Sequence, residues 1–145
     1  SLAARVAYDH RVAFMRRNLL TDVEDIGAGF DGPPGLEFHP ATEALGLSRS
    51  ALSLVRLPPD GRFPYGHAHA EQEEVYIVVR GGGRLCVDDE VVDLALWDAV
   101  RVAPRAWRGY EAGPDGLDLL VAGAPNLGAD PRSDVEGRRD WWGQA

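Results

Sequence analysis

The stretch GRFPYGHAHAEQEEVYIVVRG, residues 61–81, places two histidines one residue apart, follows them with carboxylates, and then enters an apolar run. Alternate side chains of a β-strand point to the same face, so His67 and His69 share one side of a predicted strand. Glu74 opens the apolar run, where Tyr76 has the same parity. If the chain folds back between the two segments, both imidazoles and the carboxylate face one interior.

Two imidazoles and one carboxylate in this arrangement predict a metal site. His67, His69 and Glu74 would occupy one face of an ion and leave its other positions open to water or to a ligand. These nitrogen and oxygen donors suit Fe, Mn, Zn, Ni or Cu better than Ca or Mg. We therefore expect one divalent transition metal ion, whose identity the sequence does not specify.

Short runs rich in β-branched and aromatic residues follow one another along the chain, with no helical segments between them. They are separated by predicted turns, among them the glycines of residues 81–83 and the Gly-Pro-Asp-Gly of residues 113–116. This spacing is typical of an antiparallel sandwich or barrel. We expect one domain, with a barrel core at 48–123, an N-terminal arm at 1–47 and a C-terminal tail at 124–145.

The chain of 145 residues carries a formal net charge of −8, which disfavours binding to nucleic acid and to anionic membranes. No apolar run is long enough to span a bilayer, and the single cysteine, Cys86, provides no intrachain disulfide. We expect a cytoplasmic protein with Cys86 as a small buried residue. His10 and His39 lie outside the motif and are expected in turns or at the surface.

The positions of Gly61, His67, His69, Glu74 and Gly81 match a known signature. Their spacing resembles the first motif of the cupin superfamily at each of its fixed positions. The resemblance implies an all-β fold, a small double-stranded β-helix (jelly-roll) barrel, whose interior holds the two histidines and the glutamate as metal ligands. It also implies a homodimer, which would cover open strand edges.

The segment WDAVRVAPRAWRGYEAG, residues 97–113, resembles the second cupin motif, which normally adds a further histidine ligand. Here that position falls on Arg108, and Trp97 replaces the usual glycine of the preceding turn. Arg108 and Tyr110 share a face of the predicted strand, so both are expected in the pocket. Arginine cannot act as a metal ligand.

Arg108 leaves two alternatives open. A permanent cation weakens metal binding unless negative charge lies between it and the ion, and an anionic ligand would meet that requirement. Arg108 would then anchor a small anionic molecule, with Tyr110 as a candidate for proton transfer. Alternatively, Arg108 pairs with Glu74 and no metal binds.

Three functions follow from these alternatives. The first is a metal-dependent enzyme of the oxygenase or isomerase type that acts on a small anionic metabolite. The second is a non-catalytic cupin that binds or senses a small molecule. The third is a metal-free barrel with an Arg108–Glu74 pair. In each case Trp141 and Trp142 are expected to anchor the tail on the barrel or on a partner subunit rather than to cover a ligand site.

Overall fold

The computed structural model describes residues 12–127 and 133–143, which are mainly β-strands and connecting loops. Within these ranges no helix is long and apolar enough to cross a bilayer. The elements in chain order are η1 (Gly27–Phe30), β1 (Glu37–Pro40), β2 (Ala51–Leu57), β3 (Tyr65–His69), β4 (Glu73–Val87), β5 (Glu90–Leu94), β6 (Ala99–Val102), β7 (Arg108–Ala124) and β8 (Val135–Arg139).

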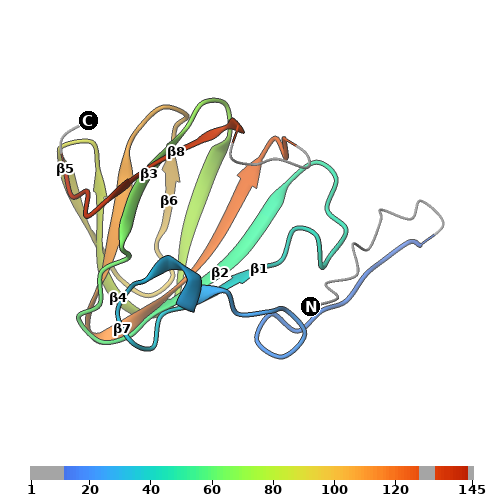
Figure 1. The fold of residues 1–145 in the computed structure, drawn as a ribbon, viewed down its shortest axis with the longest axis horizontal. Coiled ribbons are helices and arrows are strands. Elements are labelled where there is room, and N and C mark those ends of the chain that lie inside the picture. The colour runs from blue at the N-terminus through green and yellow to red at the C-terminus, as the bar shows by residue number, and fades with distance from the viewer. Residues whose placement is uncertain (1–11, 128–132, 144–145) are drawn as a thin grey trace.

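The strands form one antiparallel sheet with β7 at its centre. Strand β7 pairs with β2, β3 and β4, and β4 also pairs with β5 and β6. The sheet curls round on itself (Figure 1). Buried residues alternate with exposed or partly buried ones along the first half of β4, as expected for a strand with one face toward a core. The predicted all-β jelly-roll fold is confirmed.

Strands β4 and β7 are long because each runs through a glycine-rich segment that the sequence predicted as a turn. That prediction is wrong. Gly81 and Gly116 have φ angles of 71° and 80°, in a region that other residues rarely adopt. A Cβ atom at Gly81 would overlap the carbonyl oxygen of Gly116. Because the β4–β7 register also shifts here, the glycines bend the paired strands together instead of ending them.

The sheet extends beyond the 48–123 range expected for the barrel core. Strand β1, from the N-terminal arm, pairs with β2, and its Glu37 lies opposite Arg56. Strand β8, from the C-terminal tail, pairs along all of β3, and Gly137 lies opposite His67. The N-terminal arm and the C-terminal tail therefore each contribute a strand to the sheet, and β8 lies directly beside the two predicted histidine ligands on β3.

The C-terminal tail is anchored on the outside of the barrel by Trp141. An added Cβ at Gly66 would overlap the Trp141 ring, and one at Gly109 would lie 3.3 Å from it, so the two glycines provide a flat surface for the indole. Trp107 completes the contact, with ring centroids 6.0 Å apart. Arg62 stacks over the neighbouring Trp142 at 4.1 Å.

The interior of the barrel is an apolar core to which most strands contribute. Burying one aliphatic side chain completely in such a core, relative to leaving it in water, stabilises the fold by about 1.5–3 kcal/mol. The residues with at most 2% exposure in this cluster are Val55, Leu57, Tyr76, Val78, Leu85, Val102, Tyr110, Leu117 and Leu119. The core borders the polar residues of the candidate site. Tyr76 and Tyr110 belong both to the core and to the lining of the cavity at this site.

Candidate functional site

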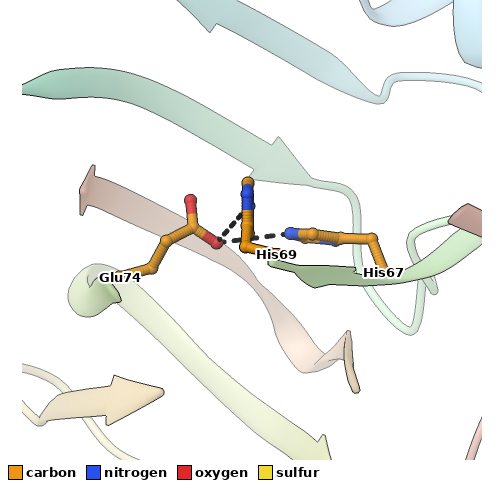
Figure 2. A group of neighbouring side chains, drawn as sticks. All are labelled: His67, His69 and Glu74. Atoms are coloured by element: carbon orange, nitrogen blue, oxygen red, sulfur yellow. Dashed lines mark hydrogen bonds and ion pairs between the residues drawn. The ribbon is translucent and has the colours of Figure 1, made fainter. Parts of the chain in front are cut away.

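The candidate site lies where β3 ends and β4 begins. His67 and His69 are on β3 and Glu74 is on β4, so the short connection between the strands brings the three side chains together (Figure 2). The Nε2 atoms of His67 and His69 lie 3.3 Å and 3.1 Å from Oε1 of Glu74. The two imidazole rings are nearly perpendicular, at 84°. The convergence predicted from strand parity is present.

Oε1 of Glu74 is the point on which the polar side chains converge. The Tyr76 hydroxyl donates a hydrogen bond to it at 2.9 Å. Although burial opposes ionisation, the hydrogen bonds with His67 and His69 hold the pKa of Glu74 far below its usual range. Burial lowers the pKa of His67 and so favours the neutral imidazole. A carboxylate and a neutral imidazole are the protonation states in which these groups bind metal ions.

Arg108 lies behind Glu74 and is fully buried, with 0% exposure. Its Nη1 atom is 3.7 Å from Oε1 of Glu74, an ion-pair distance too long for a hydrogen bond. Its Nε and Nη1 atoms have no hydrogen-bond partner in the described part of the chain, and Nη2 donates to the carbonyl of Ala103 at 3.4 Å. Parity placed this side chain inside the barrel correctly. It nevertheless does not line the cavity described next.

A cavity of about 430 Å³ adjoins the two histidines and Glu74. Its walls are mostly apolar, and many of them are aromatic. A second cavity of about 420 Å³ lies beside it and shares Phe38, Ser53, His69, Glu74 and Val121 with the first. The main cavity is lined by Gly29, Phe30, Phe38, Ser53, Val55, Phe63, Tyr65, His67, His69, Glu74, Tyr76, Tyr110, Val121, Val135 and Gly137.

The comparison with known families agrees with this geometry. The sequence profile of the cupin domain matches residues 53–121, which contain both motifs and the three candidate ligands. Solved cupin structures share the fold over most of the chain. The chain belongs to the cupin superfamily. No curated protein matches this cupin in sequence.

Three solved structures illustrate the likeness. A cupin from Bacteroides fragilis has 21% identity and a TM-score of 0.64, over 82% of this chain and 90% of that one. An RmlC-like cupin from Shewanella frigidimarina has 23% identity and a TM-score of 0.60, over 79% and 92%. Streptomyces Pac13, a nucleoside dehydratase solved with uridine, has 15% identity and a TM-score of 0.66, over 86% and 92%. These values establish a shared fold.

Two of the distances between the potential donor atoms of this cupin, those from each histidine to Glu74, match the spacing of ligands around a metal ion. With metal–ligand bonds of about 2.1 Å, neighbouring donors lie about 3.0 Å apart in an octahedral site and about 3.4 Å apart in a tetrahedral one. The measured 3.1 Å and 3.3 Å fall between these values. One atom from each of His67, His69 and Glu74 lies within 4.8 Å of the other two. The three residues therefore fit a single ion.

Asp134 supports His69 from the C-terminal tail, and sequence reasoning missed it. Its Oδ2 atom lies 2.9 Å from Nδ1 of His69, while Oδ1 accepts a hydrogen bond from the backbone of Glu71 at 2.8 Å. The Asp134 carbonyl also accepts from the Ala70 amide. A carboxylate that accepts from one imidazole nitrogen orients the other toward a metal or a hydrogen-bond partner. The segment around Asp134 has no motif that could have indicated this role.

Tyr110 brings a second hydroxyl to the cavity. The residue is 2% exposed and lines the cavity, and burial raises the pKa of its hydroxyl. Among the described residues this hydroxyl has no hydrogen-bond partner, whereas that of Tyr76 is bound to Glu74. Tyr110 therefore has a free hydrogen-bonding group, in its protonated form, for a ligand.

A second group of potential ligands, Asp25, Glu37 and His39, lies outside the cavity. His39 is buried, contrary to the expectation of a surface or turn residue, because Nδ1 bonds to the carbonyl of Val23 and Nε2 to Glu37. Arg56 forms an ion pair with Glu37, so a cation already occupies the side of that carboxylate. His39 thus ties the N-terminal arm to β1. His10 lies outside the described residues.

Cys86 does not belong to the site. It is 1% exposed and belongs to the outer cluster with Ala68, Trp107 and Trp141. Burial raises the pKa of its thiol, which disfavours the reactive thiolate. The prediction of a small buried residue is confirmed.

Proposed function

We propose that this cupin binds one divalent transition metal ion on His67, His69 and Glu74 and acts as an enzyme on a small molecule in the adjoining cavity. The observation that carries the proposal is the convergence of three potential donor atoms, all within 4.8 Å of one another, in the wall of a cavity. Two imidazoles and a carboxylate suit Fe, Mn, Zn, Ni or Cu. Open coordination positions toward the cavity would admit a ligand.

The ion, when bound, would supply Lewis-acid or redox chemistry of the kind used by oxygenases and isomerases. The protein residues prepare the surroundings. Tyr76 hydrogen-bonds the coordinating oxygen of Glu74, and Asp134 fixes the ring of His69. Tyr110 offers its hydroxyl to the ligand, and the aromatic walls exclude water.

A second candidate function rests on the position of Arg108. Its guanidinium lies 3.7 Å from Oε1 of Glu74 and is fully buried, so its positive charge can take the place of an ion beside the carboxylate. In that case the barrel binds its ligand without a metal. The polar groups of the cavity then provide hydrogen bonds to the ligand.

Elemental analysis of protein prepared without chelators tests the proposal. We expect near-stoichiometric metal in the natural sequence, loss of metal in His69→Ala, and no loss in His39→Ala, which alters the other potential ligand group. Metal that is absent from the natural sequence but present in Arg108→His would reject the metal proposal in favour of the second candidate. Metal lost only in His39→Ala would place the ion at the wrong site and reject it as well.

A further inference from the structure

We propose that the ligand of the cavity is an uncharged molecule with a flat aromatic part, which the aromatic wall holds beside His67, His69 and Glu74. This inference rests on the proposed function in one respect only, that the cavity is the ligand site. It differs from the anionic ligand that Arg108 suggested at the level of sequence.

The shape of the cavity wall supports a flat aromatic group. Phe30 lies 5.1 Å from both Phe38 and Phe63, and Phe63 lies 5.0 Å from Tyr110, measured between ring centroids. Tyr76 continues the row at 5.8 Å from Tyr110. These rings meet at tilted angles of 33° to 57°, between the stacked and the edge-to-face arrangements, and their centroids lie within the range of favourable aromatic contacts. A flat ring in the cavity would extend the same packing.

The charges around the cavity disfavour an anion. No arginine or lysine is among the described residues that line either cavity, whereas Glu74 lines both. Arg108 is held behind Glu74, so a ligand meets the carboxylate before it meets the guanidinium. A negative group in this apolar space would lose its hydration and would meet no cationic side chain among the described lining residues.

The remainder of the ligand can form hydrogen bonds. The Tyr110 hydroxyl has no partner among the described residues. The second cavity, which shares Phe38 and His69 with the first, adds the polar side chains of Thr42 and Gln72 to its lining. A ligand with an aromatic part and a neutral polar part therefore matches both cavities.

Three probes of similar size separate the features of this proposal. 2-Naphthamide is flat and uncharged, 2-naphthoate is flat and anionic, and decahydro-2-naphthamide is uncharged but not flat. Binding is measured by NMR titration of the protein. We expect 2-naphthamide to bind at least about tenfold more tightly than either of the others, which corresponds to about 1.4 kcal/mol. Tyr110→Phe should weaken its binding by about five- to tenfold through loss of one hydrogen bond.

Two further variants test whether the probe binds in the cavity. Phe38→Leu should weaken 2-naphthamide binding, and Phe14→Leu, which alters an exposed ring on the N-terminal arm, should not. Equal binding of the saturated amide would overturn the aromatic part of the proposal, tighter binding of 2-naphthoate would overturn the uncharged part, and no binding of any probe would overturn both.

The metal proposal can fail without this one. If chelator-treated protein and His69→Ala contain no metal but still prefer 2-naphthamide, the ligand class stands. If the natural sequence holds metal stoichiometrically and shows no preference among the probes, the metal site stands and the ligand class is rejected.

Discussion

Oδ2 of Asp134 lies 2.9 Å from Nδ1 of His69, although the two residues are 65 positions apart in the sequence. Both side chains are buried, at 5% and 8% exposure. The contact fixes the direction in which His69 presents Nε2 to Glu74. A residue on the C-terminal tail thus controls the geometry of the predicted metal ligands.

Replacing Asp134 should weaken metal binding without removing a ligand. We expect Asp134→Asn to lower the affinity for Zn²⁺ by about 10- to 100-fold, because His69 loses the charge that orients it and raises its basicity. Competition with a chromophoric chelator measures the affinity. Glu136→Gln, an exposed change on β8, is the matched control and should leave it unchanged. Equal affinities for both variants would show that Asp134 has no influence on the ion.

Removing the charge of Arg108 should strengthen metal binding. A buried guanidinium 3.7 Å from the coordinating oxygen repels a divalent ion, so Arg108→Gln should bind Zn²⁺ at least about tenfold more tightly. The same chelator competition measures the change. The control is Arg101→Gln, at an exposed position on β6. An unchanged or weaker affinity in Arg108→Gln would contradict a repulsive role for the guanidinium.

Glu111 should make the fold sensitive to acid. Partial burial opposes its ionisation, but hydrogen-bonded ion pairs with Arg62 and Arg84 lower its pKa below the ordinary glutamate value of 4.5. The stabilisation is therefore present above pH 4.5 and is lost as the pH falls through the lower pKa of the folded state. Because both arginines are partly exposed, it amounts to only about 0.5–1 kcal/mol.

The test is urea unfolding of Glu111→Gln at about pH 7 and about pH 3. The free energy of unfolding should depend less on pH in this variant than in the natural sequence. Glu90→Gln, which removes an exposed carboxylate from β5, serves as the control. A pH dependence equal to that of the natural sequence would show that the two ion pairs contribute nothing.

Trp97 should destabilise the protein through its backbone. It has a φ of 70° in the turn of residues 95–98 and is 70% exposed, so it adopts a conformation suited to glycine and gains little from burial. We expect Trp97→Gly to be about 1 kcal/mol more stable to urea than Trp97→Ala, which removes the ring but keeps the strain. Equal stability of the two variants would exclude backbone strain at this position.

Much of this fold could be predicted from local patterns. The period-two alternation placed His67, His69 and Glu74 toward one interior, and it also placed Arg108 inside the barrel. Local patterns failed at Gly81 and Gly116. There the same residue type that ends a strand in a turn instead bends two strands that remain paired, and only their pairing distinguishes the two outcomes.

The contribution of the tail could not be predicted, because it depends on the β3–β8 register. Asp134 reaches His69 only because Val135 lies opposite His69 in that pairing. No feature of a short polar segment specifies which distant strand it will join. The position of the Arg108 guanidinium, next to Glu74 and outside the cavity lining, could not be predicted either, because it depends on side-chain packing and not on strand parity.

The candidate ligands all lie within residues 67–74, whereas Asp134 is distant in sequence. An unfolded chain therefore keeps His67, His69 and Glu74 near one another, and it can chelate an ion weakly before any strand pairs. Such binding to the unfolded ensemble subtracts from the stabilisation that the ion gives to the native state. The thermal shift produced by metal should thus be smaller than the native-state affinity alone implies.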